Sequence, residues 1–578
     1  MHGSTGTGRA GTTWAGRTTR VRRATRATGA TQSERTTWVG DATRRWAGLA
    51  LAVAAVGTVL VAPGAGAGTV ADPPAATPVA QRAADAVRAE LDAAHVPAAA
   101  FAVLDGDAVV TGSAGAGVGP RTPFVLGSAS KSFTALAVLQ LVDRGLVELD
   151  APVTRYVPEF RVATPGAVVT VRHLLAQTSG LPTSSGLAVA VEPGTPLVER
   201  VRDAAGVHLA AAPGERFAYS NLNYAVLGRV VEQMTGASFA SYVEQQVFAP
   251  LGMDHSHTSI AAARAAGMPA ASTVWFGRDV LQEPVVAPGA LADGFLVSTA
   301  EDMAHYLRFQ LGDGTWEGTR VVSAEGLRLM HSVQAETGPD VAAASTDAYG
   351  FGWGLGRVGG TRLLAHDGDV TGFHASVALL PDVDRGLVVL VARNGVLVDA
   401  GAPSRAGTLV LAGQPAPAVG DAFDRTYGVV TGAAVLVVLA LGVGFARRRR
   451  VVLRRVRRSG GLGVVRLVAV DVAGAAALLG AAFAGVGMLT LGSPLPLALA
   501  WSSAPDVTAL VLLVAAALLV RVLLALGWGL AALRRGDGAP PPAGLRPADR
   551  RLPDTRTSSA RHTRSLASGR RRERAGLR

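Results

Sequence analysis

The most informative stretch of the sequence is Gly127-Ser128-Ala129-Ser130-Lys131-Ser132-Phe133-Thr134, because it contains Lys131. Lys131 is the only lysine in the sequence, so 54 of the 55 basic residues are arginine. An arginine keeps its proton near neutral pH, whereas a desolvated lysine can lose it. We therefore expect Lys131 to stand where a deprotonatable amine is needed.

A helix is expected to begin at Ser128, because apolar residues recur after it at helical spacing. These residues are Phe133, Leu136, Leu139 and Val142, and Arg144-Gly145 then supplies a last-turn cation and a stop. Positions i and i+3 share a helix face, so the amine of Lys131 is predicted to reach the hydroxyl of Ser128. The Ser-x-x-Lys pattern alone is weak evidence, since a serine cap followed by a surface lysine has the same spacing.

Composition and charge narrow the class of protein. The chain has 578 residues and no cysteine, which excludes disulfides, a thiol nucleophile and Cys-ligated metal. The net charge of +12 is uneven, because residues 69–426 carry 23 Lys+Arg against 35 Asp+Glu. Positive charge is thus confined to the two ends and one short loop, which fits the flanks of membrane spans better than a nucleic-acid-binding face.

The N-terminal region is expected to direct export. Residues 1–45 are Arg-rich, without hydrophobic periodicity, and are predicted to be disordered. Residues 46–68 combine a short apolar run with a tail of small residues, as in a signal peptide, and an uncleaved N-terminal anchor is the alternative. Residues 69–80 are predicted to form a linker.

Strand patterns open and close the region 81–398, and helical patterns fill its middle. Residues 98–104 and 108–114 flank an Asp-Gly turn and are predicted to form a hairpin. Four later strands are expected within 351–392, while 150–345 is mostly helical in pattern. The predicted fold class is α+β, an antiparallel sheet flanked by helices with a mostly helical inserted subdomain.

After a predicted linker at 399–426, three apolar segments are long enough to span a membrane. They cover 427–446, 467–491 and 507–533. The loop at 447–466 carries nine arginines and the tail at 534–578 carries thirteen, and this tail is expected to be basic, disordered and cytoplasmic. The first span then runs from outside to inside, so residues 69–426 are expected on the extracytoplasmic side. Asp471 and Arg521 are predicted to pair between spans or to mark a pathway, and the alternative is that they lie near the membrane interfaces or pair only for packing.

Two further motifs accompany Ser128-Ala129-Ser130-Lys131. They are Tyr219-Ser220-Asn221 and His366-Asp367-Gly368-Asp369. In this order and spacing, the chain resembles the serine β-lactamase and penicillin-binding-protein superfamily, most closely its class C β-lactamase-related branch of carboxypeptidase-like and esterase-like members. The resemblance covers roughly residues 80–395. It implies a β-lactamase/transpeptidase-like fold and a serine hydrolase domain at 81–398.

The resemblance and the chemistry of the side chains suggest a role for each residue. A serine hydroxyl needs a neighbouring base, and Lys131 is near enough to Ser128 to help. By resemblance, Tyr219 shuttles the proton between Ser128 and the leaving group. The resemblance places Asn221, His366, Gly368 and Asp369 in substrate binding. It implies that Asn221 hydrogen-bonds Lys131 or a substrate amide, and that His366 donates a hydrogen bond to Tyr219 or to a substrate carboxylate. It also implies an oxyanion hole made by the backbone N–H groups of Ser128 and Asp369, so that only the backbone of Asp369 is required.

This sequence departs from the family's motif pattern at two points, and both argue against efficient hydrolysis of β-lactam antibiotics. No glutamate is assignable as the deacylating base of class A enzymes, and His366 replaces a lysine that many relatives carry. We expect a serine hydrolase that acts through an acyl-enzyme on a D-alanyl peptide, a D-amino-acid peptide, a small ester or a β-lactam. The alternatives are a slowly acylating sensor coupled to the membrane helices and a membrane-organising protein with an inactive domain. No metal, cofactor or nucleic acid is expected; the predicted partners are substrate and membrane lipid.

Overall fold

The computed structural model describes residues 77–186, 194–283, 288–338, 346–485 and 497–536. The predictions for residues 1–45 and 46–68, for most of the linker at 69–80 and for nearly all of the tail at 534–578 lie outside these residues.

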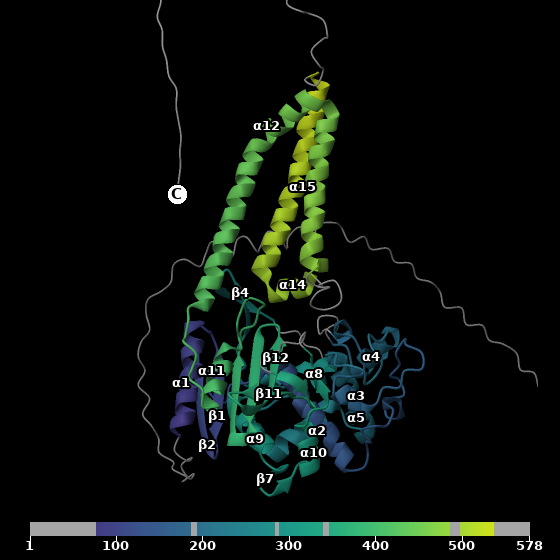
Figure 1. The fold of residues 1–578 in the computed structure, drawn as a ribbon, viewed down its shortest axis with the longest axis vertical. Helices are drawn as coiled ribbons and strands as arrows, with labels where there is room; N and C mark the ends of the chain where they lie inside the picture. Colours follow the sequence, from purple (N-terminus) through teal and green to yellow (C-terminus); the bar gives the residue numbers. More distant parts are fainter. Residues whose placement is uncertain (1–76, 187–193, 284–287, 339–345, 486–496, 537–578) are drawn as a thin grey trace, which may run out of the picture. The chain divides into compact units, whose positions relative to one another are not determined.

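An antiparallel sheet of eight strands forms the centre of the main domain (Figure 1). Its strand order is β2-β1-β14-β13-β12-β11-β10-β9. The strands are β1 (Ala99–Asp105), β2 (Ala108–Ala114), β9 (Ala335–Glu336), β10 (Thr346–Tyr349), β11 (Gly354–Val358), β12 (Thr361–Val370), β13 (Phe373–Leu380) and β14 (Arg385–Val391). Because β1 pairs with β14, the first and last parts of the domain share one sheet, which confirms the predicted fold class.

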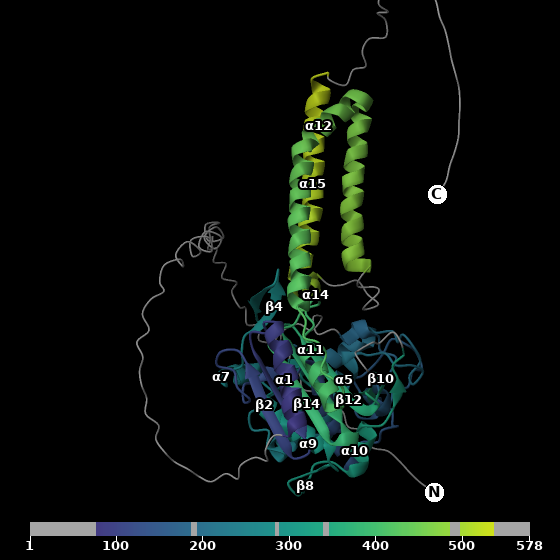
Figure 2. The same cartoon turned by 60° about the vertical axis from the view of Figure 1, so that its left-hand side comes forward.

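One face of the sheet is covered by α1 (Pro78–Ala93) and α11 (Ala402–Leu411), which lie side by side (Figure 2). Alternate strand residues, such as Phe101 and Val389, pack beneath them with no exposed surface. The prediction of a linker at 399–426 is wrong for α11. Its alanines and glycines give a linker-like composition, but Gly407 allows close contact with Leu387.

The opposite face is covered by the predicted helical insertion. The largest helices of this layer are α2 (Ser130–Asp143), α5 (Asn221–Thr235) and α9 (Ala300–Leu311), and their apolar residues join the sheet in one core. The shorter helices are α3 (Val171–Leu175), α4 (Leu197–Arg202), α6 (Phe239–Val243), α7 (Ile260–Ala265), α8 (Leu291–Gly294) and α10 (Ala324–Met330). Two-residue strands β3 (Phe124–Val125) and β6 (Val297–Ser298) pair directly before α2 and α9.

The start of α2 differs slightly from the prediction. Residues Gly127–Ala129 form a 3-10 turn, η1, and the α-helix begins at Ser130. The helix ends as predicted, with Arg144 as its C-cap and Gly145 at a φ of 70°. Ser128 therefore lies in the tight turn that leads into the helix.

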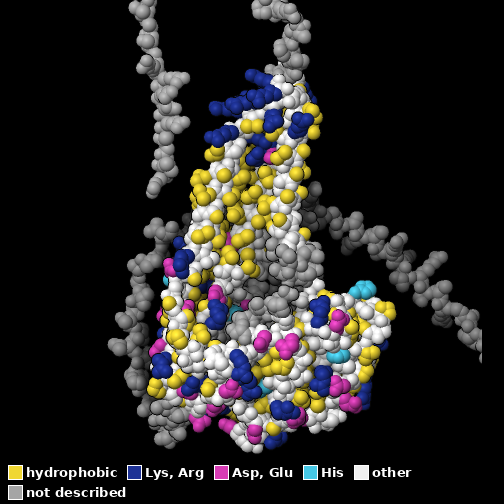
Figure 3. Space-filling model, viewed as in Figure 1, with side chains coloured by type: hydrophobic (Ala, Val, Ile, Leu, Met, Phe, Trp, Pro, Cys, Tyr) yellow, Lys and Arg dark blue, Asp and Glu magenta, His cyan; other side chains and the backbone are white. Residues whose placement is uncertain are grey.

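Among the residues that the structure describes, two helices beyond the main domain are long and apolar enough to cross a membrane, whereas the sequence predicted three spans. The helix α12 (Ala422–Leu479) contains the first predicted span, the basic loop and the start of the second span, interrupted by non-helical Gly460. After α14 (Leu497–Ser503), the second long helix, α15 (Pro505–Arg534), contains the third predicted span. Figure 3 shows hydrophobic side chains along these helices and basic ones gathered at one end. Asp471 pairs with Arg521 at 3.3 Å and with Arg448, so the predicted pairing is confirmed.

Candidate active site

Ser128 and Lys131 meet at the junction between η1 and α2. Lys131 has no exposed surface, and its Nζ donates a hydrogen bond to Ser128 Oγ at 3.0 Å. Two further acceptors complete the surroundings of the amine, Asn221 Oδ1 at 2.7 Å and the carbonyl oxygen of Asp293 at 2.6 Å. The predicted contact between the Lys131 amine and the Ser128 hydroxyl is therefore present in the structure.

The surroundings of Lys131 favour the neutral amine. Burial lowers its pKa to about 7, while the Asp293 carboxylate raises the pKa and Arg200 lowers it. A lysine with this pKa is partly neutral near pH 7 and can accept a proton from a hydroxyl. The site thus supplies a base in contact with Ser128.

Tyr219 lies beside the same amine. Its ring centroid is 5.0 Å from Lys131 Nζ, and its hydroxyl forms a hydrogen bond with Ser128. Burial raises the pKa of Tyr219 well above its usual value, Tyr349 adds to this, and the hydrogen bond with Ser128 opposes it. The phenol is therefore protonated at neutral pH, so it is placed to donate a proton rather than to remove one.

Gln177 holds the loop that carries Tyr219. Its backbone carbonyl accepts a hydrogen bond from Ala218 at 2.8 Å, and its Oε1 accepts one from the backbone N–H of Ser220 at 2.9 Å. Gln177 has no exposed surface and a φ of 58°. Gln177 lies outside the three sequence motifs, so its role in holding this loop was not predicted.

Two glycines bring β12 against the turn that contains Ser128. A Cβ on Gly368 would lie 1.9 Å from the carbonyl oxygen of Leu126 and 2.8 Å from Ser128 N. A Cβ on Gly127 would lie 2.4 Å from the carbonyl carbon of Gly368 and 2.7 Å from Asp369 N. The backbone amides of Ser128 and Asp369, the two predicted oxyanion donors, therefore border the same close contact.

The side chain of Asp369 is engaged away from this contact. Its Oδ1 lies 2.7 Å from His374 Nδ1 and accepts a hydrogen bond from Asn394 at 3.0 Å. Although burial opposes it, the hydrogen bond and charge of Asp369 raise the pKa of His374. The Asp369 carboxylate is thus engaged by His374 and Asn394, while its backbone N–H borders the Gly127–Gly368 contact.

His366 contacts Tyr349 rather than Tyr219. Its Nε2 lies 3.2 Å from the Tyr349 hydroxyl and its Nδ1 lies 2.7 Å from the carbonyl oxygen of Asp367, whereas its ring centroid is 6.4 Å from that of Tyr219. Burial, with Lys131 adding to it, lowers the pKa of His366 to about 4. A neutral ring that donates from Nδ1 accepts at Nε2 from Tyr349. His366 therefore provides no fixed positive charge at neutral pH.

The fold and the Ser128–Lys131–Tyr219 arrangement define the class to which the chain belongs. The family model described as Beta-lactamase matches residues 83–412. The chain is a member of the beta-lactamase family, which includes serine hydrolases.

Relatives among characterised proteins agree with this assignment. The chain is similar to penicillin-binding protein 4 of Amycolatopsis lactamdurans, with 32% identity over 54% of this chain and 83% of that protein. It is also similar to protein flp of Staphylococcus aureus strain N315, with 27% identity over 48% of this chain. The match spans 54% of protein flp, about half of its length.

A solved structure agrees as well. The octameric penicillin-binding protein homologue from Pyrococcus abyssi shares 25% sequence identity with this chain at a TM-score of 0.52. That comparison covers 59% of this chain and 78% of the other.

Proposed function

We propose that this protein is an exported, membrane-tethered serine hydrolase in which Ser128 forms an acyl-enzyme with an amide or ester. The observation that carries the proposal is the hydrogen bond of 3.0 Å between Ser128 Oγ and the wholly buried amine of Lys131. A hydroxyl is a weak nucleophile at neutral pH, and a base in direct contact activates it.

The proposed reaction begins with attack of Ser128 Oγ on the carbonyl carbon while Lys131 accepts the hydroxyl proton. The negative charge that develops on the carbonyl oxygen is met by the backbone N–H groups of Ser128 and Asp369, which border the Gly127–Gly368 contact. Tyr219 passes a proton to the leaving group and takes a replacement proton from Lys131. Water then adds to the acyl carbon, the bond to Ser128 Oγ breaks, and a proton from the water restores the Ser128 hydroxyl. Tyr219 is suited to the donor step because its phenol is protonated at neutral pH.

The proposed substrates are D-alanyl peptides, D-amino-acid peptides, small esters and β-lactams. Because the lowered pKa of His366 keeps it neutral, the site lacks a fixed cation at this position to bind a substrate carboxylate. This favours substrates that do not depend on a carboxylate contact with His366. Esters therefore belong in the first set of compounds tested.

One observation favours the sensor as a second candidate. The raised pKa of Tyr219 disfavours the tyrosinate that would activate water, so release of the acyl group is expected to be the slower step. In a sensor, the acyl-enzyme would persist and its occupancy would be relayed through the long helices. The ratio of labelling to turnover distinguishes a sensor from a hydrolase.

The proposed location follows from the apolar helices and the arginines. The helices pass the length and composition test for membrane spans, and the arginines between and after the predicted spans favour a cytoplasmic loop and tail. We therefore propose that the catalytic domain lies outside the cytoplasm. Protease added to intact cells should then cleave the domain, and the protein should remain in membranes after a carbonate wash.

The decisive experiment compares the detergent-solubilised full chain with its Ser128→Ala variant. Each is incubated with a fluorescent penicillin and with a chromogenic short-chain ester. Covalent label or turnover that disappears in Ser128→Ala supports Ser128 as the nucleophile. A folded wild-type protein that shows neither signal with these compounds or with a D-alanyl-D-alanine peptide would refute the proposed activity.

A further inference from the structure

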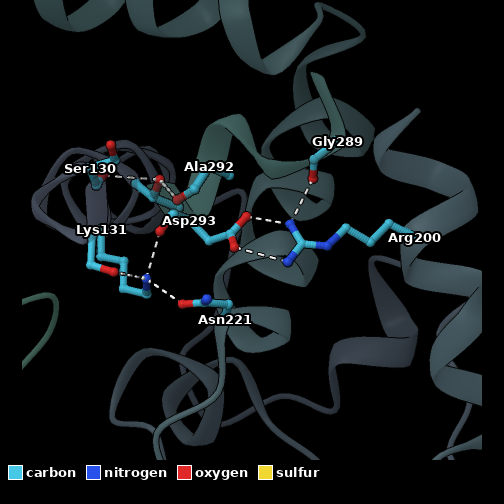
Figure 4. Close-up of polar contacts among 9 residues, drawn as sticks. Ser130, Lys131, Arg200, Asn221, Gly289, Ala292 and Asp293 are labelled. Carbon is cyan, nitrogen blue, oxygen red and sulfur yellow. Dashed lines mark hydrogen bonds and ion pairs between the residues drawn. The ribbon is translucent and has the colours of Figure 1, made fainter. Parts of the chain in front are cut away.

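A buried ion pair lies directly behind Lys131 and belongs to none of the sequence motifs. Arg200 is in α4 and Asp293 is in α8, and their side chains are 6% and 2% exposed. Nη2 of Arg200 donates a hydrogen bond to Asp293 Oδ2 at 2.9 Å, and Nη1 donates one to Oδ1. Figure 4 shows this fork facing the carboxylate on the side away from Lys131.

The same guanidinium secures the segment that leads into α8. Nη1 of Arg200 also donates to the carbonyl oxygen of Gly289 at 3.0 Å. The hydroxyl of Thr134, from α2, donates to the carbonyl oxygen of Ala292 at 2.6 Å. Residues 289–293 are thus held from both sides, with the carbonyl oxygen of Asp293 facing Lys131.

That carbonyl oxygen restricts how a neutral amine can be oriented. Neutral Lys131 has two N–H donors and one lone pair, whereas two of its three partners, Asn221 Oδ1 and the carbonyl oxygen of Asp293, can only accept. When these acceptors take both N–H groups, the lone pair is directed at Ser128. If Asp293 moved, an N–H could turn toward Ser128 and the lone pair away from it.

We propose that Arg200 and Asp293 are a positioning pair, which holds the carbonyl oxygen of Asp293 on Lys131 and so directs the amine's lone pair at Ser128. The inference rests on the proposed function, because it assigns the pair to the activation of that serine. Neither side chain is catalytic, since both act through Lys131.

The two charges of the pair also act on the pKa of Lys131 in opposite directions. The negative Asp293 raises the pKa of Lys131 and the positive Arg200 lowers it, so the charge of Arg200 opposes that of Asp293. The charged and titratable groups that face Lys131 are Asp293, Arg200, Tyr219, Tyr224 and His366. Both tyrosines and His366 are neutral near pH 7, so the ion pair supplies the charges of this set.

The test uses the only lysine of the chain as its probe. Full-length protein that contains ¹³C-lysine gives one lysine side-chain signal in NMR, and its pH titration reports Lys131 whether or not the protein is active. Arg200→Met leaves the Asp293 carboxylate unpaired, so the midpoint should rise by about one pH unit. Asp293→Asn leaves the Arg200 guanidinium, so the midpoint should fall by about the same amount.

A double variant tests the orientation of the amine. Removal of both members of a buried ion pair leaves no uncompensated charge, so Arg200→Met/Asp293→Asn should fold even where a single variant does not. Its Lys131 midpoint should stay within about 0.3 units of wild type, while labelling by fluorescent penicillin should slow by at least tenfold at pH values above the midpoint. Arg229→Met is the matched control, because Arg229 pairs with Glu159 at 2.8 Å in the same domain, and it should change neither quantity.

Each outcome bears on one of the two proposals. Opposite shifts in the single variants, with slower labelling of the double variant, support the positioning pair. Unchanged or parallel midpoints, or a folded double variant that labels at the wild-type rate, overturn it. If wild type fails to label but the single variants show the same opposite shifts, the proposed function is refuted. The shifts would still show that the pair controls the pKa of Lys131.

Discussion

Replacement of Gly368 by alanine should separate β12 from the turn that carries Ser128. The added Cβ would lie 1.9 Å from the carbonyl oxygen of Leu126, and real Cβ contacts essentially never fall below 3.0 Å. The difference requires a movement of more than about 1 Å, and backbone lies on both sides of the contact. No flexible side chain is available to absorb this movement.

The expected effect is large on acylation and moderate on stability. A displacement of about 1 Å at a reacting centre can cost ~10²-fold in rate, and the loss of one oxyanion donor costs ~10²–10³-fold. We therefore expect Gly368→Ala to label at least ~10²-fold more slowly than wild type. Overpacking of this kind should also cost about 1–3 kcal/mol of stability.

The assay is the second-order rate constant for covalent labelling by fluorescent penicillin, corrected for the folded fraction by circular dichroism. Gly206→Ala is a suitable control because a Cβ there would meet nothing within 4 Å. It should label at the wild-type rate. A folded Gly368→Ala protein that labels within about threefold of wild type would refute the assignment of this contact to the oxyanion site.

Three further predictions concern other residues. Burial lowers the pKa of Lys131 to about 7, and only the neutral amine accepts the Ser128 proton. The rate of labelling should therefore rise with pH and reach half its maximum near pH 7. A flat profile from about pH 5.5 to 8.5 would contradict this. Tyr219→Phe keeps the ring but removes the hydroxyl, so ester turnover should fall by ~10²-fold with no loss of melting temperature, and unchanged turnover would exclude the proton-transfer role. Phe133→Ala should lower the free energy of unfolding by about 3–5 kcal/mol in urea denaturation, because the wholly buried ring stacks on Tyr306 at 3.9 Å between centroids, and a loss below about 1 kcal/mol would contradict that packing.

The sheet was predictable because strands leave a short-range pattern in the sequence. The hairpin of β1 and β2 follows from two apolar runs around Asp-Gly, and the later strands follow from similar runs. The short strands β9 and β10 lack such a pattern. The helix α11 was missed because its small residues, which permit close packing on α1 and β14, also resemble a linker.

The candidate site was predictable only where the chemistry requires particular side chains close together in sequence. Ser128 and Lys131 stand three positions apart, and the resemblance supplied the roles of the other motif residues. Arg200 and Asp293 are 93 positions apart, and nothing in either local sequence marks an ion pair. Tyr349 was missed for the same reason, because only pairing of the strands brings it to His366.

The pairing of β1 with β14 also has a consequence for biosynthesis. Ala99 of β1 pairs with Val391 of β14, so β1 is synthesised long before the strand that it pairs with. Until β14 emerges, β1 has only β2 beside it, and a lone hairpin is at best marginally stable in water. Such distant contacts make folding slow and leave strand edges open to aggregation. A chain that ends before β14 should therefore fail to form the central sheet.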